Sequence, residues 1–320
     1  MKYYVGIDLG GTNIAAGVFD QNYNTVKLHS RPTIASRGFE PIAADMADAA
    51  RTVIAEAGLT PDDFSSIGIG VPSGINPVTK RVSYSNNLNW RDVPLIEEFN
   101  KHLGLPVYLA NDADSAALGE YLAGVGKDFA SILMMTLGTG VGGGMIIDGK
   151  IFLGGDNSCF ELGHITLVLD GARCTCGKYG CIESYASITG LIRQTIEAID
   201  KSPDTIMRKM CDNDFSRISG RTAFDAAKQG DKTAQAVVDR YIYYVASAIS
   251  SIDPVFRPNA VLIGGGISNE GDYLLDPVRR IVEGSIYGVG TLNPPKILKA
   301  SLGNLAGIIG AAFLETQNTG

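Results

Sequence analysis

The hexapeptide DLGGTN, residues 8–13, stands between two apolar runs at residues 3–9 and 14–20. Apolar runs on both sides of a glycine pair predict two buried strands joined by a tight hairpin. Glycine at the tip lets backbone N–H groups approach a ligand without a Cβ atom in the way. The hairpin therefore places an acidic side chain, Asp8, next to a backbone suited to anions.

The same layout of strand, glycine turn and strand recurs further along the chain. Residues 130–137 form a strand pattern, residues 138–144 a glycine-rich loop, and residues 145–150 a strand and turn. A final strand is expected at residues 260–263, followed by the glycine cluster 264–266. A single glycine turn is more often a plain turn than a binding loop. Three such loops, two of them carrying a threonine (Thr12 and Thr139), together favour phosphate binding.

The loops match neither of the two common nucleotide-binding patterns. No glycine turn is followed by Lys and Ser or Thr, and none has dinucleotide spacing. Nucleotide binding would therefore require a different architecture.

Two acidic residues follow another predicted strand, residues 106–110. Asp112 and Asp114 stand between this strand and a predicted helix at residues 115–122. The carboxyl end of a strand is where α/β sheets place ligands. We expect Asp114 to cap the helix and Asp112 to face a cleft.

Length and composition narrow the class of protein. The chain has 320 residues, 45% of them hydrophobic, with 27 Lys and Arg against 34 Asp and Glu. At about 150 residues per domain, this length predicts two domains with a cleft between them. A mildly acidic chain without basic runs disfavours nucleic acid as a partner. The longest apolar run, residues 305–314, is too short to cross a bilayer, and an early Asp8 argues against a signal peptide, so we expect a cytoplasmic protein without a membrane partner.

The remaining pattern alternates strands and helices. A buried strand is predicted at residues 67–71, and helices at residues 41–57, 232–252 and 304–314, with residues 185–230 mainly helical. Aromatic residues recur at helical spacing within residues 232–252, which indicates core or a subunit interface.

Cysteines supply a further signal. Three of the five, Cys174, Cys176 and Cys181, lie within eight residues, and an odd total in a chain of this size argues against a disulfide framework. The clustering indicates a metal site, and buried thiols without a ligand are the alternative. Cys159 and Cys211 are interpreted as packing residues.

Five stretches together resemble a known family. They are DLGGTN at residues 8–13, NDAD at 111–114, GTGVG at 138–142, ELGH at 161–164 and CTCGKYGCIE at 174–183. Their order and spacing are similar to those of ROK-family sugar kinases, and NLNW at residues 87–90 brings the chain nearest to the bacterial ATP-dependent glucokinases of that family.

The resemblance implies a fold and an activity. The fold would be α/β, actin/hexokinase-like (ribonuclease H-like), with two domains around a central cleft: residues 1–112 plus about 303–320, and residues 113–302 with the zinc element. The activity would be phosphorylation of glucose to glucose 6-phosphate by ATP and Mg²⁺. Alternatives are another hexose substrate (N-acetylmannosamine, mannose, fructose, allose or a β-glucoside), a sugar-sensing regulator, or an actin-like ATPase. Because seven residues precede Asp8, we expect no helix-turn-helix domain of the kind that the family's repressors carry.

The resemblance also implies residue roles. Asp112 matches the general base, which orients the sugar hydroxyl and takes its proton as the bond to phosphorus forms. Asp8 matches the position that holds the Mg²⁺ of MgATP. Many relatives carry Lys where this chain has Asn13, which leaves more charge neutralisation to Mg²⁺ and backbone donors. The nucleotide-binding positions are Asp8, Gly10, Gly11, Thr12, Asn13, Thr139, Gly140, Gly265 and Gly266.

Sugar and zinc positions follow in the same way. One imidazole and three thiolates form the closed set that structural Zn²⁺ prefers, and glycines 177 and 180 would give the backbone freedom for it. The family's Pro-Gly is replaced here by Pro72-Ser73-Gly74, a change expected to affect the choice of hexose. A homo-oligomer, dimer or tetramer, is expected. The zinc ligands would be His164, Cys174, Cys176 and Cys181, and the sugar contacts Gly74, Asn87, Asn111, Asp112, Glu161, His164 and Glu183.

Overall fold

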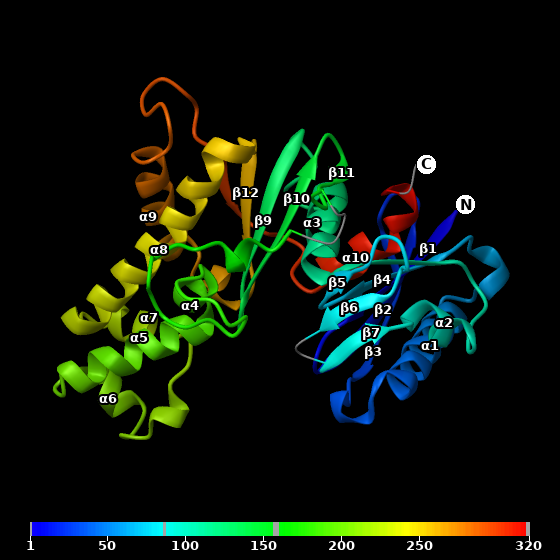
Figure 1. Ribbon diagram of the computed structural model, residues 1–320, viewed down its shortest axis with the longest axis horizontal. Coiled ribbons are helices and arrows are strands. Elements are labelled where there is room, and N and C mark those ends of the chain that lie inside the picture. Colours follow the sequence, from blue (N-terminus) through cyan, green and yellow to red (C-terminus); the bar gives the residue numbers. More distant parts are fainter. Residues whose placement is uncertain (1, 86–87, 156–159, 318–320) are drawn as a thin grey trace. The chain divides into compact units, whose positions relative to one another are not determined.

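The computed structural model describes residues 2–85, 88–155 and 160–317, which form two compact units (Figure 1). Unit 1 comprises Met1–Met134, Gly144–Phe160 and Ser301–Gly320, and unit 2 comprises Met135–Gly143 and Glu161–Ala300. The domain division expected from the sequence stays a prediction, because compactness does not establish which segment folds by itself.

Unit 1 contains a five-stranded sheet in the order β3-β2-β1-β4-β8. Its strands are β1 (Tyr3–Leu9), β2 (Asn13–Asp20), β3 (Thr25–Pro32), β4 (Ile67–Val71) and β8 (Val107–Asn111). β1 pairs antiparallel with β2 and parallel with β4, and β4 pairs parallel with β8. The predicted hairpin and the predicted strands at residues 67–71 and 106–110 are confirmed, and the structure adds that β4 and β8 run parallel to β1. The sequence does not reveal β3, because its residues are mostly exposed and lack an apolar pattern.

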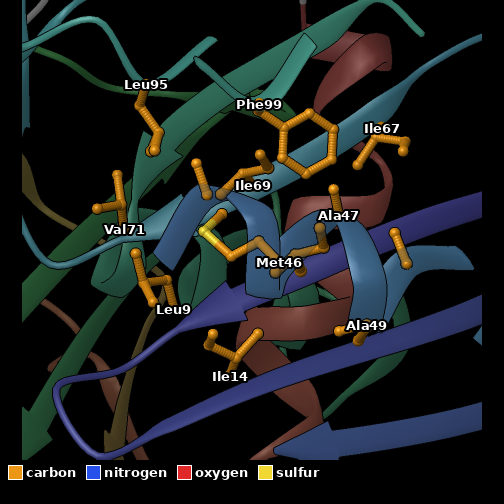
Figure 2. Packing of buried hydrophobic residues seen from close by; sticks show 14 of the residues in the cluster. Leu9, Ile14, Met46, Ala47, Ala49, Ile67, Ile69, Val71, Leu95 and Phe99 are labelled. Atoms are coloured by element: carbon orange, nitrogen blue, oxygen red, sulfur yellow. The ribbon is translucent and has the colours of Figure 1, made fainter. Parts of the chain in front are cut away.

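The two faces of β1 are used differently. Val5, Ile7 and Leu9 are fully buried in a core that includes Met46 of α1 (Phe39–Glu56). Figure 2 shows Leu9 and Met46 among the packed side chains of this core. The alternate positions of a strand point to the opposite face, so Asp8 lies on the side away from this core.

Other elements complete unit 1. A small sheet has the order β5-β6-β7, and three further helices join α1. The elements are β5 (Gly74–Ile75), β6 (Val82–Ser85), β7 (Trp90–Val93), α2 (Leu95–Asn100), α3 (Asp112–Ala123) and α10 (Leu305–Ala312). The predicted helices at residues 41–57, 115–122 and 304–314 therefore correspond to α1, α3 and α10.

Helix α10 packs against the sheet and α3 through glycines. A Cβ atom added at Gly68 of β4 would lie 1.6 Å from the carbonyl oxygen of Ala311, and one at Gly310 would lie 1.7 Å from that of Ser115. Separations this short are impossible, so the backbones touch where these side chains are absent. We call this contact the glycine-packed layer, formed by α10 with Gly6, Gly68, Gly119 and Gly310.

A second five-stranded sheet has the order β11-β10-β9-β12-β13. Its strands are β9 (Ser131–Leu137), β10 (Val141–Ile147), β11 (Lys150–Ile151), β12 (Ala260–Gly264) and β13 (Lys296–Lys299). Two sequence predictions are wrong here. The predicted loop, residues 138–144, is too long, because β10 begins at Val141. Gly143 is therefore a strand residue, and it packs tightly against Leu162. Residues 260–263 do not form the final strand, since β13 follows and pairs parallel with β12.

Helices make up most of unit 2. The longest, α8 (Lys232–Phe256), buries Tyr241 completely, and its hydroxyl donates to the carbonyl oxygen of Ala186 at 2.7 Å. The aromatic pattern of this helix therefore contributes to the core. In the described part of the chain, no helix is both long and apolar enough to cross a membrane. The other helices of the unit are α4 (Glu183–Ala186), α5 (Ile188–Lys201), α6 (Ile206–Met210), α7 (Thr222–Lys228) and α9 (Asp272–Glu283).

Candidate functional site

The tip of the β1–β2 hairpin forms the first part of the site. The Gly10 N–H donates to the carbonyl oxygen of Asn13 at 2.8 Å, which closes the turn. Thr33 holds the tip from outside: its hydroxyl donates to Gly10 O at 2.9 Å and its N–H to Thr12 O at 2.9 Å. Thr12 and Asn13 are exposed, so the turn is both fixed and open to a ligand. Nothing in the sequence singles out Thr33, because it lies 23 residues from Gly10.

Asp8 lies half-buried at the end of β1. Burial, and after it the charge of Asp112, raise the pKa of Asp8 to about 7. Its carboxylate packs against the helix α10 at Gly307, where an added Cβ would be 2.9 Å from one oxygen. A nearby divalent cation would stabilise the charged form of Asp8, so this position fits Mg²⁺.

Asn111 and Asp112 mark the junction of β8 and α3. The Asn111 side-chain oxygen accepts from the N–H groups of Ala113 at 2.8 Å and Asp114 at 3.2 Å. Asn111 is therefore the N-cap, and the prediction that Asp114 caps the helix is wrong. A cap must precede the helix with extended backbone, whereas Asp114 lies within the first turn and is fully buried.

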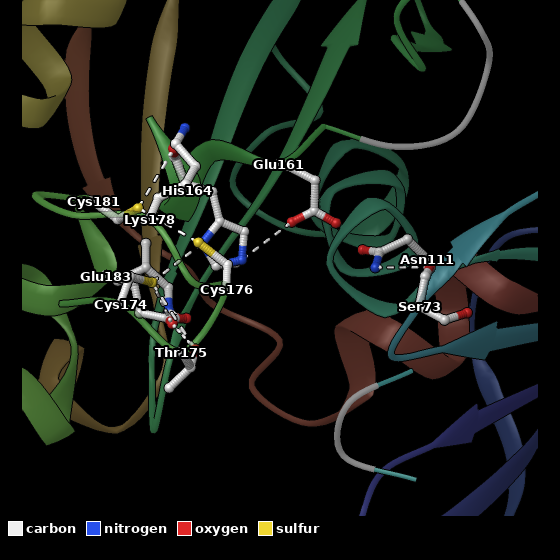
Figure 3. Close-up of polar contacts among 12 residues, drawn as sticks. Ser73, Asn111, Glu161, His164, Cys174, Thr175, Cys176, Lys178, Cys181 and Glu183 are labelled. Carbon is white, nitrogen blue, oxygen red and sulfur yellow. Dashed lines mark hydrogen bonds and ion pairs between the residues drawn. The ribbon is translucent and has the colours of Figure 1, made fainter. Parts of the chain in front are cut away.

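The cap also ties down the neighbouring loop. The Asn111 Nδ2 donates to Ser73 O at 3.2 Å, as Figure 3 shows. Ser73 is 6% exposed, and its hydroxyl has no hydrogen-bond partner among the described residues. Gly74 begins β5 beside it. Asn87, which the sequence proposes as a sugar contact, lies outside the described residues.

Unit 2 carries the second glycine turn, residues 138–141, which we call the glycine loop. Gly138 N–H donates to Gly140 O at 3.0 Å within the turn. The start of α5 holds it: Ile188 N–H donates to Gly138 O at 2.8 Å, and the Thr189 hydroxyl donates to Thr139 O at 2.8 Å. Thr139 itself is exposed.

The third glycine turn follows β12. Gly265 has a φ of 82°, and a Cβ there would lie 2.4 Å from Leu137 O, so only glycine fits. The Ser268 hydroxyl donates to Gly265 O at 2.7 Å, and Gly266 begins a short 3₁₀ turn, Gly266–Glu270. Because Gly265 has no side chain, the turn can pass close to the end of β9 at Leu137.

The predicted metal ligands come together in unit 2. One donor atom from each of His164, Cys174, Cys176 and Cys181 lies within 4.8 Å of the others. His164 Nδ1 is 3.6 Å from Cys174 Sγ, and Cys176 Sγ is 3.7 Å from Cys181 Sγ. A tetrahedral ion with Zn–S bonds of about 2.3 Å separates its sulfur ligands by about 3.8 Å. The spacing thus fits zinc and exceeds the length of a disulfide, about 2.05 Å.

Electrostatics and backbone support the same interpretation. Burial, and then the neighbouring thiols, raise the pKa of Cys181 to about 12, so a thiolate at this position would need a bound cation to stabilise its charge. Gly177 and Gly180 have φ values of 92° and 76°, which confirms the need for glycine in this turn. We call residues 174–181 the cysteine knuckle. Of the two other cysteines, Cys211 is 1% exposed and packs as predicted, whereas Cys159 lies outside the described residues.

Two residues predicted to bind the sugar, Glu161 and Glu183, lie next to the predicted metal ligands. Glu161 Oε2 is 3.9 Å from His164 Nε2. Glu183 is engaged on both oxygens: Oε1 accepts from the Thr175 hydroxyl at 3.0 Å, and Oε2 accepts from the Val141 N–H at 3.2 Å. Figure 3 shows the Glu183 contacts with the knuckle. Sequence reasoning missed Thr175, because a threonine between two cysteines carries no signal by itself.

Each unit therefore gathers one set of the predicted residues. Unit 1 places Asp8, the hairpin tip, Asn111 and Asp112 together, and unit 2 places the glycine loop with the knuckle and Glu183. A hairpin with an acidic strand end, a repeated strand-glycine-strand layout and helix-flanked sheets define an ATPase of the actin/hexokinase-like fold.

Comparisons with known proteins agree with this class. The sequence profile of the ROK family matches residues 4–318. A glucokinase from Streptomyces coelicolor is 35% identical over 319 residues, covering 99% of this chain and 98% of that protein. A glucokinase from Thermotoga maritima is 34% identical over 319 residues, covering 99% and 98%.

Solved structures give the same result. A ROK glucokinase from Streptomyces griseus in complex with glucose and AMPPNP has a TM-score of 0.82 and 34% identity, covering 98% of each chain. A ROK hexokinase from Thermus thermophilus has a TM-score of 0.81 and 32% identity, covering 99% of this chain and all of that one. The chain belongs to the ROK family, and the predicted fold class is confirmed.

Proposed function

We propose that this protein phosphorylates a hexose with ATP, and that glucose is converted to glucose 6-phosphate. The observation that carries the proposal is the pair Asp8 and Asp112, held at the ends of two strands beside an open glycine hairpin. Similarity to glucokinases over nearly the whole chain supports this assignment. The likeness to a structure with glucose and AMPPNP supports the choice of substrates.

Asp112 is the proposed general base. Its Oδ1 already accepts from the Ala113 N–H at 2.9 Å, which fixes the carboxylate at the start of α3. A carboxylate is too weak a base to ionise a sugar alcohol beforehand, so Asp112 orients the hydroxyl and receives its proton as the bond to phosphorus forms. Fixing the geometry of the reactants is the larger part of such catalysis.

Asp8 and the glycine turns are proposed to hold MgATP. When bound, Mg²⁺ neutralises phosphate charge, and Asp8 would hold it, directly or through water. The N–H groups of the hairpin at residues 11–13 and those of Thr139 and Gly140 would donate to phosphate oxygens. Asn13 adds no charge there. Gly265 and Gly266 would accommodate the adenosine side.

The sugar would be held by carboxylates, which accept hydrogen bonds from its hydroxyl groups, and by amide N–H groups, which donate to them. The proposed zinc, held by the knuckle and His164, keeps His164 and Glu183 in place and takes no part in the reaction. The Asn111 oxygen serves as a cap and one N–H of its Nδ2 donates to Ser73 O, so the second N–H of Nδ2 is the donor left for a sugar. The proposed contacts are Gly74, Asn111, Asp112, Glu161, His164 and Glu183.

An ADP-release assay with MgATP tests the proposal. The panel contains glucose, mannose, fructose, allose, N-acetylglucosamine and N-acetylmannosamine, with a blank that lacks sugar. Glucose-dependent turnover well above the blank and the other sugars is expected. Preference for another sugar would keep the mechanism and shift the substrate, and the Ser73–Gly74 loop would then be the first place to look. Turnover without sugar would contradict the proposal.

Asp112→Asn separates the base from the fold. We expect turnover to fall at least about 10²-fold to 10⁴-fold, with glucose binding retained. Asp128→Asn is the matched control, because Asp128 is an exposed acidic residue in the turn that follows α3. Near-normal turnover of Asp112→Asn would reject the assignment of the base.

Two further proposals concern the oligomeric state of the protein and the compartment in which it acts. We expect a homo-oligomer, a dimer or tetramer, which light scattering after size-exclusion chromatography measures directly. We also expect the protein to act in the cytoplasm.

A further inference from the structure

The Glu183 carboxylate joins two regions of unit 2. Its Oε1 accepts from the hydroxyl of Thr175, in the cysteine knuckle, at 3.0 Å. Its Oε2 accepts from the N–H of Val141, at the end of the glycine loop, at 3.2 Å. The Cys174 thiol, also in the knuckle, donates to Oε1 at 3.5 Å, so the knuckle holds one oxygen and the glycine loop holds the other.

The contact with the glycine loop is close as well as polar. A Cβ atom added at Gly140 would lie 2.4 Å from Glu183 Oε2, so the carboxylate rests directly on the backbone. Ile188 and Thr189 of α5 hold the first half of the loop through Gly138 O and Thr139 O. Glu183 therefore holds the second half, and the loop is supported at both ends.

Thr175 is well placed to control this support. It stands between Cys174 and Cys176, so its backbone position depends on the knuckle. As a β-branched residue it has few allowed χ1 angles, which directs the hydroxyl. Glu183 Oε1 is its near acceptor, since Cys174 Sγ lies farther away, at 4.0 Å. The Cys174 thiol also donates to Oε1, at 3.5 Å, but as a zinc-bound thiolate it would have no proton to donate. The Thr175 hydroxyl is then the knuckle donor that orients Oε1, and the terminal torsion of a glutamate is broad without such a donor.

We propose that Thr175 is a positioning residue: its hydroxyl orients the Glu183 carboxylate, and through it the cysteine knuckle sets the geometry of the glycine loop that binds phosphate. The inference rests on the proposed function for the ligand of that loop. It assigns the knuckle a role in nucleotide binding besides its support of the sugar contacts.

Titration of AMPPNP and Mg²⁺ into the sugar-free protein tests the inference. Thr175→Val keeps the shape and removes the donor, and its dissociation constant for AMPPNP should rise about 3-fold to 10-fold, the usual range for one hydrogen bond. In turnover, KM for ATP should rise by a similar factor while kcat changes less than about twofold. Preparations are compared at equal zinc content, measured by mass spectrometry.

Two variants serve as controls. Thr175→Ser retains the hydroxyl and should bind AMPPNP within about twofold of the unmodified protein. Ser184→Ala removes a hydroxyl next to Glu183 that bonds to Arg173 O instead, and should leave AMPPNP binding unchanged.

The outcomes separate this inference from the proposed function. Unchanged AMPPNP binding in Thr175→Val would overturn it, even if KM for glucose rose, because Glu183 would then serve the sugar alone. Equal losses in Thr175→Val and Thr175→Ser would also overturn it. Absence of sugar-dependent turnover in the unmodified protein would count against the kinase proposal, while the AMPPNP titration would still decide the role of Thr175.

Discussion

The glycine-packed layer of unit 1 and the cysteine knuckle of unit 2 both hold proposed active-site residues, by opposite means. In the layer, backbone meets backbone at Gly68 and Gly310, which brings α10 against the sheet, and Asp8 lies against Gly307 of the same helix. In the knuckle, few regular elements exist, and Glu183 is held by polar contacts beside a set of metal ligands.

The difference teaches what each region tolerates. A closely packed layer has no free space, so its stability should fall when side-chain volume is added and should not change when a chelator removes metal. A coordination site fixes its surroundings through a few bonds, so the knuckle is sensitive to the chemistry of its donors. Four substitutions test this contrast, taken in order of expected effect.

Gly68→Ala should have the largest effect. The added methyl group would lie 1.6 Å from Ala311 O, a backbone atom that cannot move without displacing α10. We expect a loss of roughly 3–5 kcal/mol in the free energy of unfolding, or failure to fold. Gly104→Ala is the control, since no atom lies within 4 Å of its added Cβ. Denaturant unfolding measures both, and equal stabilities would contradict the packing argument.

Cys176→Ser should come next, and its effect should be confined to unit 2. Zinc should be lost, and with it about 3–4 kcal/mol of the stabilisation that a ligand at 100 to 1,000 times its Kd provides. Hydrogen exchange should accelerate in residues 161–183 and stay unchanged in β1 and α10. Metal content is measured on the same samples. Stoichiometric zinc in the variant would reject the proposed ligand set.

Glu120→Gln tests whether polar contacts also matter in unit 1. Glu120 is fully buried in α3, and its carboxylate accepts from Leu302 N–H at 2.6 Å and the Ser301 hydroxyl at 3.1 Å, just before α10. An amide would place a donor against these donors, at a cost of about 2–3 kcal/mol in stability. Thermal unfolding measures this cost, with Glu97→Gln on the surface as control. An unchanged midpoint would show that the glycines alone hold α10.

Glu315→Gln should have the smallest effect and one that depends on pH. Although partial burial opposes it, hydrogen bonds from Lys2, Ser65 and Ser66 lower the pKa of Glu315 to about 2, from an ordinary 4.5. A lowered pKa stabilises the fold above about pH 4.5, and this contribution disappears as the pH falls toward 2. The variant should lose roughly 1 kcal/mol or less at pH 7, because the site is partly exposed.

The pH series supplies the check. The stability difference between the protein and Glu315→Gln should shrink steadily between pH 5 and about pH 2. A difference that stays constant over this range would mean that the charge of Glu315 contributes nothing. The contacts of Glu315 with Lys2, Ser65 and Ser66 would then be a place where the stability of unit 1 depends on charge, whereas the glycine-packed layer depends on side-chain volume.

Taken in order, the family motifs determined the fold class, and local patterns determined the hairpin, the strands β4 and β8, and the cluster of three cysteines. These features depend on local signals: apolar runs, glycine turns and cysteine spacing each act within a few residues. The family motifs, read in order, also determined the kind of reaction.

Tertiary structure alone decided how these pieces are held. Thr33 supports a turn 23 residues away, Glu183 reaches Val141 from 42 residues away, and Gly68 is small because a helix near the C-terminus rests on it. The cap of α3 is Asn111 and not Asp114, because the helix begins at Asp112, three residues before the predicted start at residue 115. Such contacts join residues far apart in the chain, so no local pattern records them; they exist because folding brings distant backbones within hydrogen-bonding and van der Waals distance.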